Sequence, residues 1–504
     1  MPRFSHSCLA SALLIVSASV FVDAAPAQNR ALPDLDAIVK KVIAREQIVG
    51  ASVLVAKGNK IIFHKGYGYA DLGLEAPTKA ETVYHVVGPM MPFTGVAILQ
   101  LAEQHKLSLD DDISKFVPEF PVQGHHVTIL ELLNHTSGIV DYHYLGDPIE
   151  ATSRLPKALD EVMALYADKH WVNEPGTKWD WSISGFQLLV TILERVSGLT
   201  YEAYVRQNIL DPAGVSKTST TYCDDSTLVH GLSHGYRRFG SGKSHVLAHE
   251  DSTAYNTDLR YCSTVGDLYQ AWRAIEDKNL INAGSRARMR MPVGPAVHMR
   301  ADDPKMHFGL AVTLNHEDDH PSVGQHGSLL GYAGSLYEFP EDHLTIVVLT
   351  NTEGQNAYAI SRALARAILK LPALPDPKPP APEPEWSDVS VSADQIRSLD
   401  GTFVLTAGKL PPTLHDSYAQ YRRTYRIFNE NGRLMIQALG QSPERLLKQS
   451  DGTFRMASSP RTRLSFGQVN DHIPILSMES PGGLPLAGAR VGPGDPQTFH
   501  RQLN

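Results

Sequence analysis

Apolar residues recur with two different periods near the start of the chain. Residues 35–46 carry apolar side chains at helical spacing, which predicts a helix. Two runs rich in β-branched residues follow at 49–56 and 61–68, separated by residues 57–60, Lys-Gly-Asn-Lys. Such a turn between two strand-like runs is typical of a β-hairpin. Residues 84–103 predict the end of a strand, a tight Gly-Pro turn and an amphipathic helix.

The middle of the chain has mainly helical periodicity, and strand-like runs return later. The predicted helices are 185–198, 201–210 (ended by Asp-Pro-Ala-Gly at 211–214), 263–276 (capped by Ser263 or Thr264) and 357–371. The late strands are predicted at 307–315, 335–339 and 344–350. Early and late strands around a helical middle are compatible with one antiparallel sheet that carries a helical insertion.

A proline-rich segment divides the chain. Residues 372–387 predict a stiff, extended linker, because proline fixes φ and removes backbone donors. Beyond it, residues 388–504 contain short strand-like runs separated by Asn/Gly and Asp/Gly turns. We therefore expect a first domain over 30–371, the linker, and a small accessory domain, either a β-barrel or a sandwich.

The N-terminus has the features of an export signal, which we assign to residues 1–25. Arg3 precedes an apolar stretch at 9–22, and small residues follow at 24–27. The apolar stretch is short for a membrane span, so we expect a periplasmic or secreted protein with no membrane span after cleavage. The 504 residues carry a net charge of −8 and no basic run, which argues against a nucleic-acid partner.

Two cysteines, Cys223 and Cys262, remain after signal removal. They pair in an oxidising compartment or stay as two buried thiols, and the sequence leaves both possibilities open. The histidines show no helical pair with a third ligand, and the side chains of His125 and His126, being adjacent, diverge. We expect no metal and no cofactor.

Residues 84–103 resemble the nucleophile helix of the serine β-lactamase and penicillin-binding protein family, related to the class C β-lactamases. Residues 128–139 (TILELLNHTSGI) and 174–178 (EPGTK) continue the resemblance, which covers about 35–371. It implies an α/β (α+β) fold: a β-lactamase-like antiparallel sheet with flanking helices and a large helical insertion, followed here by the small all-β C-terminal domain.

The residues that carry the family's chemistry are replaced. Its Ser-x-x-Lys motif falls on Gly88 and Met91, which offer neither a nucleophile nor a base. Its Tyr-x-Asn motif falls on Trp181 and Ile183. Its third motif, Lys-Thr-Gly or His-x-Gly, puts Gln325 in the place of the cation. His326 follows Gln325, and strand alternation turns it to the other face unless the strand bulges.

Other residues are candidates for a new ligand site. The resemblance places six aromatic residues around one cleft, where aromatic rings suit sugar faces or fill a core: Tyr142, Tyr144, Trp171, Trp179, Trp181 and Tyr332. Arg260 stands where many relatives have glycine, either as a substrate clamp or in a surface ion pair. Asp180, between two tryptophans, caps a backbone N–H or carries a raised pKa suited to acid catalysis.

Three functions remain open. One is a hydrolase that acts on a glycan through carboxyl groups and a water molecule; its candidates are Asp180, Asp141 and Glu353, with Asp258 and His326 behind them. Another is an inactive family member that binds a small-molecule or oligosaccharide ligand through Gly88, Gln325 and the aromatic and arginine residues named above. A conventional serine hydrolase is the third, if the motif alignment is wrong. The gain of Asp180, Arg260 and two tryptophans favours the first.

Overall fold

A computed structural model describes most of the chain. The described residues are 33–146, 158–217, 220–223, 228–239, 243–246, 260–292, 305–329, 331–375, 387–407, 421–439, 443–456, 462–469, 473–479 and 485–494. The predicted signal peptide, most of the linker and Asp258 lie outside them. Within the described residues, no helix is both long and apolar enough to cross a bilayer.

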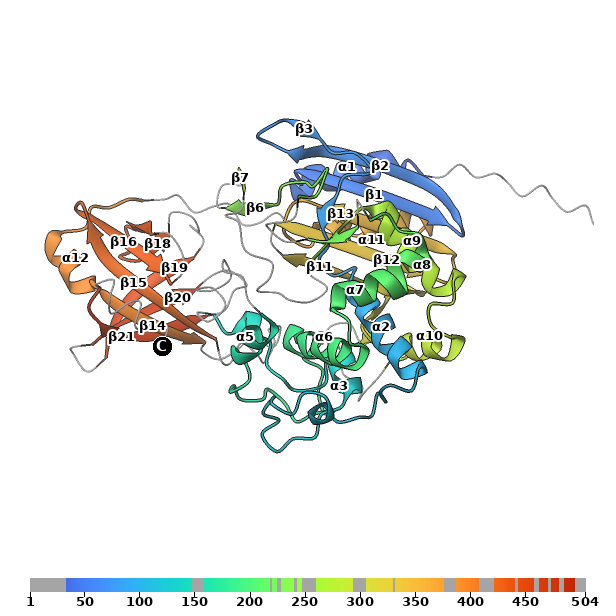
Figure 1. The fold of residues 1–504 in the computed structure, drawn as a ribbon. Coiled ribbons are helices and arrows are strands. Elements are labelled where there is room, and N and C mark those ends of the chain that lie inside the picture. Colours follow the sequence, from blue (N-terminus) through green and yellow to red (C-terminus); the bar gives the residue numbers. More distant parts are fainter. Residues whose placement is uncertain are drawn as a thin grey trace, which may run out of the picture. The chain divides into compact units, whose positions relative to one another are not determined.

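An eight-stranded antiparallel sheet is the centre of the first part of the chain (Figure 1). Its strands are β1 (Gly50–Lys57), β2 (Lys60–Asp71), β3 (Ala76–Pro77), β9 (His307–Phe308), β10 (Thr313–Glu317), β11 (His320–Leu329), β12 (Tyr332–Phe339) and β13 (Leu344–Thr350). Their order is β3-β2-β1-β13-β12-β11-β10-β9, so early and late strands meet where β1 pairs with β13. The predicted single antiparallel sheet is confirmed.

The alternation of β1 separates two hydrophobic cores. Val53 and Val55 pack with helices α1 (Leu35–Glu46) and α11 (Asn356–Ile368) on one face of the sheet. Leu54 and Ala56 point to the opposite face, where α2 (Met91–Glu103) belongs to a larger core. Because successive strand residues point to opposite faces, one apolar run serves both cores.

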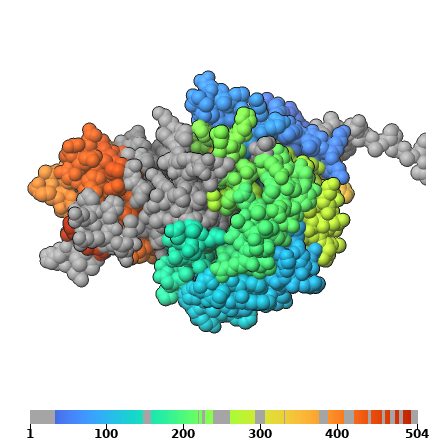
Figure 2. All heavy atoms as spheres, viewed as in Figure 1, coloured from blue at the N-terminus to red at the C-terminus, as the bar shows by residue number. Residues whose placement is uncertain are grey.

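The helical insertion covers the second face and contains most of the remaining elements. These are η1 (Ile113–Lys115), α3 (Ile129–Leu133), η2 (Tyr142–Tyr144), α5 (Leu159–Ala164), α6 (Ile183–Ser197), α7 (Tyr201–Val205), η3 (Arg206–Leu210), α8 (Asp211–Ala213), α9 (Val265–Asp277) and α10 (Ala283–Met289). A three-stranded sheet joins β4 (Tyr84–His85), β8 (Tyr261–Ser263) and β5 (Thr221–Tyr222), and β6 (Tyr236–Phe239) pairs with β7 (Lys243–Val246). In the space-filling view, the cyan and green atoms of the insertion form a continuous surface (Figure 2).

Two sequence predictions need correction in detail. The helix predicted at 201–210 is followed directly by the one-turn helix α8, so helical structure ends only at Gly214, whose φ is 74°. Pro212 lies in the first turn of α8, where its missing N–H costs no hydrogen bond. The single strand predicted at 307–315 is instead two strands. A turn between them places Ala311 at φ 60° and is closed by the N–H of Gly309 donating to the carbonyl of Val312.

The C-terminal part is a closed barrel, which decides between the barrel and the sandwich. Its strands pair in chain order and close on each other, and helix α12 (Ala393–Leu399) precedes them. They are β14 (Gly401–Ala407), β15 (Arg422–Glu430), β16 (Arg433–Ala438), β17 (Glu444–Lys448), β18 (Phe454–Met456), β19 (Arg463–Val469), β20 (Ile473–Glu479) and β21 (Leu486–Gly492). Apolar side chains such as Phe403 and Leu476 fill its interior.

Candidate functional site

A cavity of about 1320 Å³ lies at the edge of strand β11. Strand β10 pairs with β11 only as far as Gly324, and the next residues of β11, Gln325 to Leu329, line the cavity. The turn before α2 and the loop before α6 border the cavity on one side of β11, and helix α11 borders it on the other. The cavity therefore reaches both faces of the sheet around one strand.

Gly88 lies in the cavity wall, at the position that the resemblance assigns to the nucleophile. Its φ is 91°, a conformation that favours glycine. A Cβ there would lie 2.4 Å from the carbonyl carbon of His326 and 2.5 Å from the nitrogen of Gly327. The backbone of β11 thus occupies the space that any side chain at residue 88 would need.

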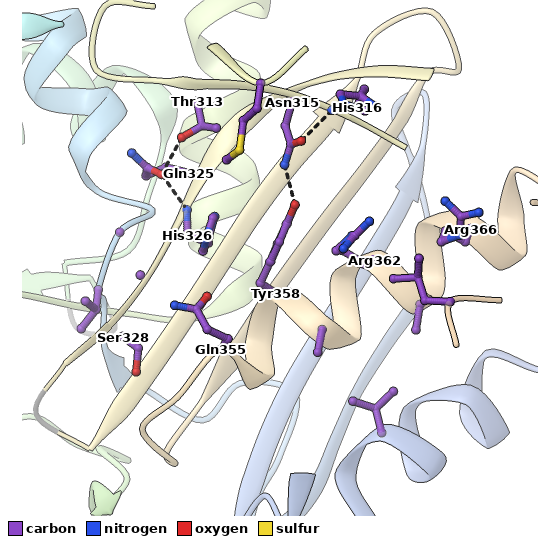
Figure 3. Close-up of a pocket in the computed structure, with 18 of the residues that line it drawn as sticks. Thr313, Asn315, His316, Gln325, His326, Ser328, Gln355, Tyr358, Arg362 and Arg366 are labelled. Carbon is purple, nitrogen blue, oxygen red and sulfur yellow. Dashed lines mark hydrogen bonds between the residues drawn. The ribbon is translucent and has the colours of Figure 1, made fainter. Parts of the chain in front are cut away.

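Gln325 and Met91, which the resemblance aligns with the two cations of the family motifs, are neutral and contact each other. Gln325 Nε2 lies 3.3 Å from the sulfur of Met91, and Gln325 Oε1 accepts hydrogen bonds from Thr313 Oγ1 and from the N–H of His326, both at 3.0 Å. Gln325 is almost fully buried. This part of the cavity therefore holds satisfied, uncharged polar groups (Figure 3).

His326 points to the face of β11 opposite to that of Gln325, because β11 pairs with β12 without a bulge; of the two orientations that the sequence left open, the structure has this one. Its Nδ1 lies 2.8 Å from Tyr337 Oη, and its ring stacks on Tyr358 of α11 with centroids 4.2 Å apart. Burial, together with the positive charge of Arg362, lowers the pKa of His326 to about 4. The imidazole is neutral at neutral pH, and strand β11 separates it from the α2 side of the cavity.

Asp141 lines the cavity, but its carboxylate is fully engaged in the fold. It accepts hydrogen bonds from the N–H groups of His143 (2.9 Å) and Ile183 (3.0 Å), and His143 Nδ1 lies 3.1 Å away. Burial raises the pKa of Asp141, but the contacts with His143 and the backbone donors outweigh burial and hold the pKa below its usual value. Such a group does not serve as a general acid at neutral pH.

The segment Trp179-Asp180-Trp181 divides between cavity and core. Both indoles line the cavity, whereas Asp180 is buried and is not one of the lining residues. His135 organises the segment: its ring lies 4.4 Å from that of Trp181, its carbonyl accepts from the N–H of Asp180 and its Nδ1 accepts from the N–H of Ser182. The two tryptophans are thus held rigidly at the cavity wall.

The other predicted site residues do not line the cavity, and each has a structural contact. Glu353 accepts hydrogen bonds from the N–H of Gly331 and from Arg237, both at 2.9 Å. The guanidinium of Arg260 lies 4.4 Å above the ring of Tyr222. Tyr142 is buried against Tyr166, and the hydroxyl of Tyr332 donates to the carbonyl of Ser233 at 2.5 Å. The structure therefore does not bring Asp180, Asp141 and Glu353 to one reaction centre.

Three residues of α11 with polar or charged side chains, none of them a predicted site residue, line the cavity: Tyr358, Arg362 and Arg366 (Figure 3). Tyr358 Oη accepts from Asn315 Nδ2 at 2.5 Å, and both arginines pair with the carboxylate of Glu317 on β10. Their spacing of four residues within a predicted helix puts them on one face, and that pattern was available as a signal.

Comparisons with known proteins agree with this architecture. The chain is 24% identical over 417 residues to Penicillin-binding protein 4* of Bacillus subtilis, which covers 80% of this chain and 87% of that protein. It is 26% identical to Protein flp of Staphylococcus aureus, over 65% of this chain and 64% of that protein. A penicillin-binding protein of Bacillus halodurans superposes with a TM-score of 0.57 at 24% identity, over 66% of this chain and 99% of that one. A D-stereospecific amidohydrolase of Streptomyces superposes with a TM-score of 0.57 at 19% identity, over 66% of this chain and 98% of that one.

The family profile described as Beta-lactamase matches residues 35–370, which are more than half of the chain. These residues contain the sheet, its flanking helices and most of the residues that line the cavity. On that match and on the architecture described above, the chain belongs to the Beta-lactamase family, a family of hydrolases.

Proposed function

We propose that this chain is a non-acylating member of the family that binds a small-molecule or oligosaccharide ligand in the cavity beside β11. The observation that carries the proposal is the closed position at residue 88. A serine there would meet the backbone of β11 at 2.4 Å, and its partner position holds a methionine in contact with a neutral amide. Formation of an acyl-enzyme needs a nucleophile, a base and room for the acyl carbon.

The class of ligand follows from the cavity wall. Trp179 and Trp181 offer flat apolar faces, and the hydroxyls and amides of Ser328, Gln355 and Tyr144 offer polar partners. Sugar rings, with an apolar face and a polar rim, fit such walls. The export signal predicted at residues 1–25 leads us to propose that the ligand is met in the periplasm or outside the cell.

Hydrolysis of a glycan by carboxyl groups is the second interpretation that the sequence left open. A glycosidase needs two carboxyl groups that face one bond. Of Asp180, Asp141 and Glu353, Asp141 alone lines the cavity, and its oxygens are bonded to the backbone and to His143. This arrangement favours binding over turnover.

Two experiments test the proposal. The protein is exposed to a fluorescent penicillin and to a fluorophosphonate, and its intact mass, measured by mass spectrometry, is expected to stay unchanged. An adduct mapped to a residue of the cavity would refute the non-acylating assignment. Bacterial cell-wall and periplasmic glycans are then titrated while tryptophan fluorescence is followed. We expect a bound glycan whose affinity falls at least about tenfold in Trp181→Ala.

The matched control is Trp171→Ala, because Trp171 packs on His125 outside the cavity wall. An equal loss in both variants, or binding by none of the glycans, would remove the carbohydrate assignment. New reducing ends during the incubation would replace the binding function with glycan hydrolysis.

A further inference from the structure

A second group of reactive side chains lies outside the cavity, on the three-stranded sheet of β4, β8 and β5. His85 on β4 is directly opposite Cys262 on β8, and Cys223 follows β5, where its N–H donates to the carbonyl of Arg260 at 2.7 Å. Directly opposite residues of an antiparallel pair project from the same face. The sheet therefore brings one imidazole and two sulfur atoms together.

The two cysteines, which the sequence left open, form a disulfide with Cα atoms 5.8 Å apart. His85 Nδ1 lies 3.6 Å from Cys223 Sγ, and one ligand atom from each of the three residues lies within 4.8 Å of the others. Local spacing in the sequence does not indicate this cluster, because its ligands are 138 and 39 residues apart and meet only across strands.

The surroundings of this cluster are apolar on one side and open on the other. Val83, Val229 and Leu232 pack around the two cysteines, which are almost fully buried. His85 is only partly buried, and its ring lies 5.3 Å from that of Tyr332, which limits its orientation. Two thiolates in such an apolar pocket are unfavourable unless a cation compensates their charge, and a divalent cation does so completely.

We propose that reduction of the Cys223–Cys262 disulfide creates a binding site for a borderline-soft divalent cation of the Zn²⁺ class. The two Sγ atoms and His85 Nδ1 are three ligands, and the partly exposed side of His85 leaves a fourth position for water. Cys₂His sets with one open position are established zinc ligation. The oxidised chain therefore binds no metal at this position, whereas the reduced chain binds one ion.

The reaction balances with a dithiol as the reductant. The dithiol gives two electrons and two protons to the disulfide and becomes a disulfide itself, and metal binding then releases both thiol protons. Zn–S bonds of about 2.3 Å and a Zn–N bond of about 2.1 Å need ligand atoms roughly 3.5–4 Å apart. The observed separation of 3.6 Å between Nδ1 and Sγ already fits, and rotation of the cysteine side chains supplies the rest.

The test uses Co²⁺ as a spectroscopic probe for this site in the full chain. All proteins carry Cys8→Ser, so that Cys223 and Cys262 supply the only thiols. Reduced and desalted protein is expected to bind about one equivalent of Co²⁺ with a thiolate-to-cobalt charge-transfer band, and oxidised protein is expected to show no such band. His85→Ala is expected to weaken Co²⁺ binding at least about tenfold.

His234→Ala is the matched control, because His234 is an exposed histidine paired with Asp71. It is expected to leave Co²⁺ affinity unchanged. His85→Ala keeps the disulfide, so its fold is checked by circular dichroism before reduction. Absence of the charge-transfer band in reduced protein, or equal affinity in His85→Ala, would overturn the proposal. Equal affinity would also be the result if reduction unfolded the chain and Co²⁺ bound loose thiols.

Discussion

The backbones of Gly88 and Gly327 are in contact: a Cβ on Gly327 would lie 3.1 Å from the Cα of Gly88, and a Cβ on Gly88 would lie 2.5 Å from the nitrogen of Gly327. The contact joins the turn before α2 to strand β11. Glycine at both positions permits an approach that a side chain would prevent. The packing of the domain at this point thus depends on residue 88 having no side chain.

A serine at residue 88 is therefore expected to destabilise the domain. Gly88→Ser adds a strained φ of 91° and a clash with β11, and we expect a loss of about 3 kcal/mol in the free energy of unfolding. Urea titration followed by tryptophan fluorescence measures it. The control is Gly198→Ser, with φ 73° and open space around its Cβ, which is expected to cost about 1 kcal/mol. Equal losses would show that the contact with β11 is unimportant.

The pKa of His326 predicts a pH dependence of stability. The folded pKa is about 4, below the unfolded value of about 6.5, so the unfolded chain binds more protons between these pH values. Stability is therefore complete above about pH 6.5 and falls as the pH decreases toward 4, by up to about 3 kcal/mol.

Urea titrations of wild type and His326→Gln between pH 4.5 and 7.5 test this dependence. The variant is expected to lose less stability than wild type as the pH falls. His64→Gln, which changes an exposed histidine on β2, is expected to keep the wild-type slope. An unchanged slope in His326→Gln would contradict the assigned burial of His326.

Most of the fold was predictable because its elements have strong local patterns. Helix α1 and strand β13 have the predicted bounds, since an amphipathic period and an apolar β-branched run define them without help from the rest of the chain. The sequence left the direction of His326 open, because strand alternation turns it away from the face of Gln325 only if the strand has no bulge, and a bulge is not visible in the sequence.

The site was predictable only in part, because loop side chains are oriented by distant contacts. Asp141 is held by Ile183, 42 residues later, and Glu353 by Arg237, 116 residues earlier. Neither partner is visible in local spacing, so both carboxylates were expected in the cleft as reactive groups. Trp179 and Trp181, whose segment the resemblance positioned near the cleft, line the cavity, and their role in binding stays a prediction.

Asp141 is expected to act as a structural carboxylate. Asp141→Asn removes the negative charge beside His143 Nδ1 and weakens the acceptor for the N–H of Ile183, and we expect a loss of about 2 kcal/mol at pH 7. Since the folded pKa of Asp141 is lowered, the stability it contributes is present above about pH 4 and is lost below it. Urea titration at pH 7 is the measurement, and exposed Asp110→Asn is the control. Loss of turnover on a glycan without loss of stability would instead make Asp141 catalytic.

Glu317 is expected to be the residue that ties strand β10 to helix α11. Its side chain is 3% exposed and accepts hydrogen bonds from both Arg362 and Arg366. Glu317→Gln keeps the side-chain volume but removes one of the two carboxylates, Glu317 and Asp318, that balance the charges of Arg362 and Arg366. Urea titration is therefore expected to show a loss of about 3 kcal/mol in the free energy of unfolding. Asp318→Asn is the control, because Asp318 is half exposed and Arg366 would keep its contact with Glu317; this variant is expected to lose much less stability than Glu317→Gln. Equal losses in the two variants would mean that solvent screens the ion pairs of Glu317 and Asp318 alike, and Glu317 would then not be the residue that ties β10 to α11.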